Sequence, residues 1–83
     1  MIFEPRGVCS QAIEFEIEDN KLKYLKFYGG CPGNLEGISK LAKNRNILDI
    51  IEDLEGIKCG SKTTSCPDQL AQALKQYLKK EIA

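Results

Sequence analysis

The segment that decides the fold class reads Ile13-Glu14-Phe15-Glu16-Ile17-Glu18-Asp19-Asn20-Lys21-Leu22-Lys23-Tyr24. Apolar and acidic residues alternate in its first half, which is the period of a strand with one buried face. Asp19 and Asn20 tolerate the left-handed backbone that a two-residue hairpin turn requires. A turn at these residues predicts two charged and two apolar cross-strand pairs: Glu18 with Lys21, Glu16 with Lys23, Ile17 with Leu22, and Phe15 with Tyr24.

Two features around this hairpin leave the arrangement of the sheet open. In the predicted register, Leu25 and Phe27 fall on the polar face of the second strand. Either a bulge near Tyr24 or a sheet covered on both faces would explain them. Residues 2–5 are a candidate edge strand, whose length Pro5 limits because proline lacks the amide proton that a sheet ladder needs. The sheet is therefore predicted to be a hairpin or a three-stranded meander.

Three segments with a helical spacing of apolar residues follow the hairpin. The first begins near Cys31, the second covers residues 47–54 with Gly56 placed as its left-handed cap, and the third runs from about Pro67 to the end. We predict an α+β fold, in which a small antiparallel sheet is followed by three helices packed on one of its faces. The residues expected to face the core are Leu35, Ile38, Leu41 and Ala42, then Ile47, Leu48, Ile51 and Leu54, then Leu70, Ala71, Leu74, Tyr77, Leu78 and Ile82.

The composition describes a small protein without a strong electrostatic field. Its 83 residues, taken as a single domain over 1–83, carry 12 Lys plus Arg and 12 Asp plus Glu. This balance gives no reason to expect nucleic acid or an acidic membrane surface as a partner. No apolar run approaches the roughly 20 residues that span a bilayer, and Met1–Arg6 lacks the features of a signal peptide. We expect a cytoplasmic protein.

The chemistry-bearing residues are four cysteines, and the sequence contains no histidine. Cysteines of proteins in a reducing compartment more often bind metal, react or stay reduced than form structural disulfides. Two of them open the same pattern, Cys-Pro-x-x-Leu, at the expected start of a helix, where the helix dipole favours a thiolate. The four cysteines are Cys9, Cys31, Cys59 and Cys66.

Several functions are compatible with these cysteines. Four thiolates could hold a zinc ion in a closed, structural site, although the paired Cys-x-x-Cys knuckles of many zinc sites are absent. Alternatively, Cys66 could attack a disulfide, with Cys59 or Cys31 as the resolving thiol. A third reading is nucleotide or phosphate binding at the helix N-termini, although no Walker or Rossmann fingerprint is present. The thiols could also be inert, with Ser65 or Thr64 as an N-cap that, followed by Pro67 and Asp68, does no more than start a helix well.

Four sequence pieces, in order, resemble the TSCPD domain family; the last runs from Thr64 through Ala71, and its first five residues, Thr64-Ser65-Cys66-Pro67-Asp68, spell the family's name. The whole chain is similar to the small stand-alone, four-cysteine proteins of that family. The other matching pieces are Gly7-Val8-Cys9-Ser10, then Gly29-Gly30-Cys31-Pro32-Gly33-Asn34 with Gly37-Ile38, and then Gly56-Ile57-Lys58-Cys59-Gly60.

The resemblance implies that the four cysteines form one functional, metal-binding set, and zinc is the metal that a set of four thiolates suits. TSCPD segments also occur at the C-terminus of some ribonucleotide reductases, so the resemblance implies a relation to those enzymes and a reductase as a candidate protein partner. Reductase chemistry needs a large barrel with a radical-forming cysteine, a cofactor and a nucleotide site, which 83 residues cannot supply. We therefore expect an accessory or binding module, and leave open whether the chain is itself an enzyme.

Overall fold

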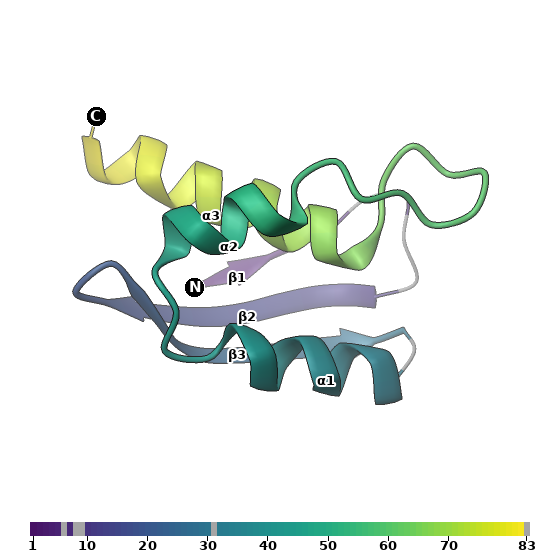
Figure 1. The fold of residues 1–83 in the computed structure, drawn as a ribbon, viewed down its shortest axis with the longest axis horizontal. Coiled ribbons are helices and arrows are strands. Elements are labelled where there is room, and N and C mark those ends of the chain that lie inside the picture. Colours follow the sequence, from purple (N-terminus) through teal and green to yellow (C-terminus); the bar gives the residue numbers. More distant parts are fainter. Residues whose placement is uncertain (6, 8–9, 31, 83) are drawn as a thin grey trace.

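The computed structural model describes residues 1–5, 7, 10–30 and 32–82 of the chain. A three-stranded antiparallel sheet in the order β1-β2-β3 is followed by three helices (Figure 1), which confirms the predicted α+β class and selects the meander. The elements are β1 (Ile2–Phe3), β2 (Ser10–Glu18), β3 (Lys21–Gly29), α1 (Pro32–Ala42), α2 (Ile47–Leu54) and α3 (Cys66–Ile82). No helix within these described ranges is long and apolar enough to cross a membrane.

The turn between β2 and β3 forms where the sequence predicts it. Asp19 and Asn20 have φ angles of 55° and 61°, the left-handed values that a tight hairpin turn needs. The two pairs next to the turn, Glu18 with Lys21 and Ile17 with Leu22, are those predicted. The hairpin therefore follows its local sequence signals up to this point.

The next two predicted pairs, Glu16 with Lys23 and Phe15 with Tyr24, are wrong. The ladder shifts between Glu16 and Ile17, so that Glu16 pairs with Tyr24 and Phe15 with Leu25. Lys23 is the extra residue of a β-bulge, and one extra residue moves every later side chain of β3 to the opposite face. The bulge, one of the two explanations left open by the sequence, therefore accounts for Leu25 and Phe27.

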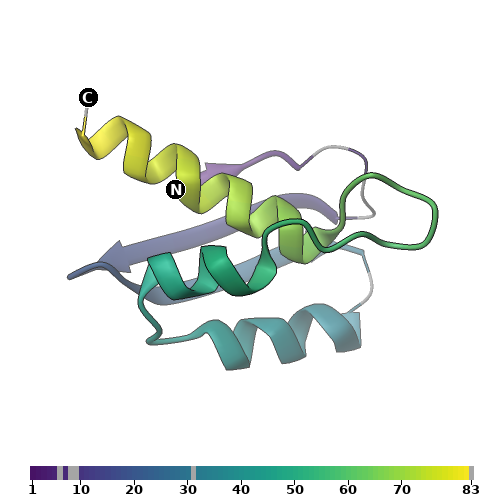
Figure 2. The ribbon, with the colours of Figure 1, turned by 45° about the horizontal axis from the view of Figure 1, so that its top comes forward.

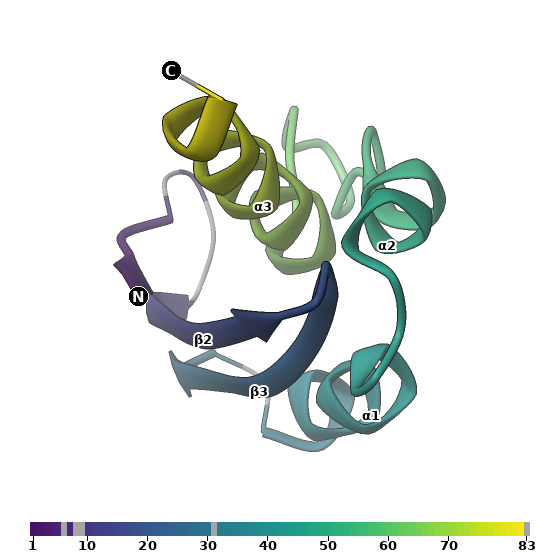
Figure 3. The ribbon, with the colours of Figure 1, turned by 90° about the vertical axis from the view of Figure 1, so that its left-hand side faces the viewer.

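All three helices contribute side chains to one core on the apolar face of the sheet. The bulge turns Leu25 and Phe27 to the same face as Ile13 and Phe15, where they pack against the helices. Helix α3 lies across β1 and β2, and α1 lies beside β3 (Figure 3), while α2 packs against α3 (Figure 2). The fully buried large side chains are Ile13, Phe15, Leu22, Ile47, Ile50, Leu70 and Leu74.

Two residues predicted to face the core are exposed instead. Leu41 of α1 is 77% exposed and Leu48 of α2 is 60% exposed, whereas Ile50, which was not predicted, is fully buried. The buried stripe of α2 follows the spacing i, i+3, i+4 and i+7 from Ile47, and Leu48 lies one residue, about 100°, away from it. Leu41 is displaced in the same way from its buried neighbour Ala42.

The opposite face of the sheet is open to solvent, as the alternating glutamates of β2 predict. The Tyr28 hydroxyl donates a 2.7 Å hydrogen bond to the Glu14 carboxylate, and the Lys26 ammonium lies 5.0 Å from the centre of the Tyr28 ring. The hydrogen bond to Glu14 raises the pKa of Tyr28, because it stabilises the protonated phenol. This face is therefore polar, with the Tyr28 ring held between two charged neighbours.

The link between α1 and α2 pairs with the beginning of β3. The Leu22 amide donates to the Arg45 carbonyl at 3.0 Å, and the Leu22 carbonyl accepts from the Asn44 amide at 2.6 Å. Asn44 has a φ of 67°, which ends α1 and turns the chain back toward the strand. Backbone hydrogen bonds thus cover the first residues of an otherwise open sheet edge.

Candidate thiol site at the start of helix α3

Ser65 begins helix α3 and ties it to the preceding loop. Its buried hydroxyl accepts a hydrogen bond from the Asp68 amide at 3.2 Å, so Ser65 is the N-cap of the two candidates, Ser65 and Thr64, that the sequence offers. The same hydroxyl donates to the Ile57 carbonyl at 2.7 Å. Cys66 follows as the first residue of the helix, and its side chain is half-buried. The position of this thiol is therefore set by a side chain that bonds in two directions.

Asp68 joins the end of α2 to the start of α3. Asp68 is only 7% exposed, and its carboxylate accepts hydrogen bonds from the Gly56 amide at 2.8 Å and from the Thr64 hydroxyl. Burial by itself disfavours the charged carboxylate, but the bonds from Thr64, Gly56 and Gln72 and the charge of Lys75 outweigh it and lower the pKa of Asp68. Asp68 is thus a buried, hydrogen-bonded anion at neutral pH.

Cys59 lies in the loop that leads to this helix, and its side chain is exposed. Its amide donates to the Thr64 carbonyl at 3.2 Å, and its carbonyl accepts from the Lys62 amide at 3.0 Å. These two bonds close the loop between Cys59 and Thr64. The backbone of Cys59 is therefore hydrogen-bonded to Thr64, which lies two positions before Cys66.

Cys9 and Cys31, the other two predicted ligands, lie outside the described residues. Their neighbours in the chain are described. Gly7 has a φ of 73°, and a Cβ atom built on it would lie 3.3 Å from the Thr64 methyl carbon, so the backbone at Gly7 passes close to Thr64. Ser10 pairs with Gly29 across the sheet.

These contacts gather the cysteine-bearing segments at one end of the molecule. The start of β2, the end of β3, the start of α1 and the loop over residues 57–65 all lie at this end (Figure 1). Among the described residues, which include two of the four cysteines, no group of three or more cysteine, aspartate or glutamate side chains could hold a metal ion. The described parts of the four cysteine-bearing segments thus lie together at this end of the molecule.

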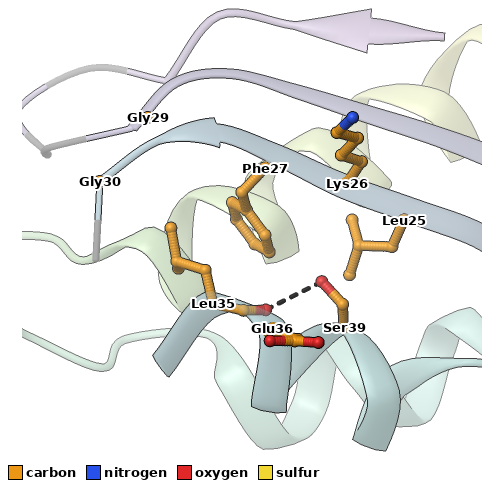
Figure 4. Close-up of a pocket in the computed structure, with 8 residues that line it drawn as sticks. All are labelled: Leu25, Lys26, Phe27, Gly29, Gly30, Leu35, Glu36 and Ser39. Carbon is orange, nitrogen blue, oxygen red and sulfur yellow. Dashed lines mark hydrogen bonds between the residues drawn. The ribbon is translucent and has the colours of Figure 1, made fainter. Parts of the chain in front are cut away.

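A pocket of about 330 Å³ lies at the same end of the sheet, between β3 and α1. Leu25, Phe27 and Leu35 point into it, whereas Lys26 points away (Figure 4). The Ser39 hydroxyl on its rim donates to the Leu35 carbonyl at 2.9 Å. The pocket is thus chiefly apolar, and Gly30 on its wall directly precedes Cys31 in the sequence. It was not predicted, because it depends on the bulge that turns Leu25 and Phe27 inward.

The profile of the TSCPD domain matches residues 2–78, nearly the whole chain. The chain belongs to the TSCPD domain family. Neither the curated proteins nor the solved structures contain a significant match to it.

The letters of the TSCPD motif have distinct structural roles in this chain. Thr64 donates to the carboxylate of Asp68, and Ser65 caps the helix. Pro67 stands in the first turn, where the amide proton that it lacks would have no intrahelical partner. The prediction of a well-made helix start is therefore confirmed. The long-range bond from Gly56 to Asp68 was missed, and its only sequence signal was the proximity of a glycine cap to this motif.

Proposed function

We propose that this TSCPD protein is a small metal-binding module, in which the thiolates of Cys9, Cys31, Cys59 and Cys66 hold a zinc ion. The observation that carries the proposal is the contact between chain neighbours of these cysteines. Gly7 lies against Thr64, Ser10 pairs with Gly29, and the Cys59 amide bonds to Thr64. Segments far apart in the sequence are thus adjacent where a shared ion would need them.

The available donor groups fit a structural zinc site better than a catalytic metal site. With no histidine in the sequence, thiolates are the main soft ligands, and four thiolates around zinc make a closed, tetrahedral, structural site. Cys66 begins a 17-residue helix, whose dipole favours a negative charge at that end. Bound zinc would tie the loops to the sheet and contribute to folding. The surface so fixed would then serve a partner protein, for which the family relationship suggests a ribonucleotide reductase.

A thiol redox role is the second candidate, favoured by the exposed position of Cys59 in the loop next to Cys66. In this scheme the Cys66 thiolate attacks a disulfide of a partner protein and forms a mixed disulfide, releasing one partner thiolate. The Cys59 thiolate then attacks Cys66, which releases the second partner thiolate and leaves a Cys59–Cys66 disulfide. Two electrons pass to the partner, and a cellular dithiol would have to reduce the protein again.

Metal analysis and thiol titration on one sample separate these two functions. Protein purified anaerobically without chelator should contain one equivalent of zinc and should react slowly with a thiol reagent. A strong chelator should then release four reactive thiols and lower the melting temperature. Cys59→Ser should lose the ion, whereas Ser61→Ala, an exposed change in the same loop, should retain it.

Negligible metal in the wild-type protein, with a melting temperature that chelation does not change, would contradict the metal-binding proposal. If such metal-free protein also formed an intramolecular disulfide that Cys66→Ser abolished, the redox candidate would be supported. Uniformly slow thiols in metal-free protein would contradict both.

A further inference from the structure

The outer edge of β1 presents backbone groups that are directed away from the sheet. Met1 and Phe15 exchange both of their backbone hydrogen bonds, at 2.7 and 2.8 Å. In an antiparallel pair, such residues alternate with residues whose amide and carbonyl groups point outward. Ile2 is the next residue after Met1, and β1 is an edge strand of the sheet. The amide and carbonyl of Ile2 therefore face the open edge.

A row of glutamines on α3 runs beside this edge. Gln69, Gln72 and Gln76 are spaced three and four residues apart, which places them on one side of the helix. They line a pocket of about 510 Å³ together with Ile2, Phe3 and Glu4. Helix α3 and β1 lie next to each other in Figures 2 and 3, so the groove has a strand edge as one wall and a helix as the other.

Hydrogen bonds orient two of the three glutamine amides in this row. Gln69 donates to the Thr64 hydroxyl at 2.9 Å, and Gln72 donates to the Asp68 carboxylate at 3.4 Å. Gln76 is an exposed residue. Each glutamine carries both donor and acceptor capacity, which suits amide and hydroxyl groups of a bound chain. The groove is thus connected to the thiol site through Thr64 and Asp68.

We propose that an extended, basic segment of a partner protein adds to the edge of β1 as a fourth strand, in the groove between β1 and α3. Outward-facing backbone groups are satisfied by the backbone of another extended chain, and side-chain pockets beside the edge select its sequence. The side chain opposite Phe3 would enter the glutamine row, which favours threonine, serine or asparagine there.

Charge complementarity selects a basic segment. Glu4 is exposed on the rim of the groove, and Glu14 is the cross-strand partner of Ile2. Among the residues that the structure describes, none that lines the groove is a lysine or an arginine. A second copy of this chain is the other possible occupant of this edge, and the test below distinguishes it from a basic segment.

The test uses an acetylated, amidated octapeptide of alternating lysine and threonine, titrated into the 15N-labelled protein as isolated. Saturable shifts are expected at the amides of residues 2–4 and at the side-chain amides of Gln72 and Gln76. A peptide with glutamate in place of lysine should bind roughly tenfold more weakly or worse, and so should a peptide with alternate backbone amides methylated. Glu4→Lys should weaken binding of the basic peptide, whereas Glu52→Lys, an exposed change on α2, should not.

Three outcomes would overturn the proposal. One is an absence of saturable binding at millimolar peptide. Another is binding that backbone methylation leaves unchanged, since it would reflect charge alone. The third is a dimeric protein whose β1 amides are already protected from hydrogen exchange, since the edge would then be covered by a second copy. None of these outcomes depends on the metal content measured above.

Discussion

Helices α1 and α3 begin with the same pattern, Cys-Pro-x-x-Leu, but the rest of the protein holds their first turns differently. The leucine of each pattern is buried, with Leu35 6% and Leu70 0% exposed. Helix α3 is capped by Ser65 and carries Asp68 in its first turn, whereas α1 has no acidic residue in that turn. The shared pattern therefore supplies a thiol and a leucine anchor, and the flanking residues supply the connections.

Beyond their first turns, the two helices also differ in burial, and α3 is the more deeply buried. Leu70, Ala71, Ala73 and Leu74 of α3 are all at most 1% exposed. Helix α1 exposes Leu41, and a side chain added at its Gly37 would meet nothing within 4 Å. A residue pattern can thus mark the start of a helix without stating how firmly that helix is packed. We expect α3 to be central to stability and α1 to be peripheral.

The largest expected effect comes from truncating the two anchor leucines. Leu70→Ala leaves a sealed cavity in the core and should lower the free energy of unfolding by about 2–5 kcal/mol. Leu35→Ala opens instead onto the pocket between β3 and α1, so its loss should be close to the transfer term, about 2 kcal/mol. Urea denaturation of both variants measures the difference. Equal losses would contradict the peripheral position of α1.

Asp68→Asn tests the connection that α1 lacks. An asparagine cannot accept a hydrogen bond from Thr64 through its amide nitrogen, so we expect a loss of about 1–3 kcal/mol at neutral pH. Because the pKa of Asp68 is lower in the folded protein than in the unfolded chain, its stabilisation is present above the unfolded value of about 4 and is lost as the pH falls through the folded value. The stability difference between wild type and variant should therefore shrink in acid. A pH-independent difference would indicate a purely steric effect.

Gly37→Ala should strengthen α1. Its new methyl group has open space, and alanine loses less backbone entropy than glycine in a helix, so a gain of about 0.5–1 kcal/mol is expected. Gly56→Ala is the matched control, because the φ of 85° at Gly56 strains any side chain and should make that variant less stable. Thermal unfolding of both proteins checks the two signs. A destabilised Gly37→Ala protein would show that α1 is packed more tightly than its contacts indicate.

The smallest effect is expected at the ion pair between Lys75 of α3 and Glu55 at the end of α2. Both side chains are more than two-fifths exposed, so solvent screens the pair. Lys75→Gln should cost roughly 0.2–1 kcal/mol at low salt, and less as salt is added. Lys79→Gln, an exposed change on the same helix, provides the baseline. A loss above this range would mean that α2 and α3 depend on the pair more than on their apolar contact.

Features that depend on neighbouring residues could be predicted from the sequence, and features that depend on packing could not. The Asp19-Asn20 turn, and an N-cap at Thr64 or Ser65, follow from residue types within a few positions. A bulge near Tyr24 could be proposed but not selected over a sheet covered on both faces, because that choice depends on which sheet face the helices cover. Leu48 was predicted to face the core and Ile50 was not, whereas the structure buries Ile50 and exposes Leu48. The predicted and the observed apolar stripes of α2 share their other three residues, so the spacing alone does not decide between them. The bond between Gly56 and Asp68, 12 residues apart, depends on how α2 and α3 meet.

The paired link between α1 and α2 has a consequence for the behaviour of the protein at high concentration. Long, flat strand edges recruit other molecules and can seed fibrils, and β3 is a nine-residue edge strand. Asn44 and Arg45 occupy its first backbone groups, the bulge at Lys23 bends the strand, and Lys26 adds charge further along. Edge-to-edge pairing of β3 with the sheet of another molecule is thereby blocked at several points along the strand. The short edge at β1 is left as the place where a further strand can be accepted.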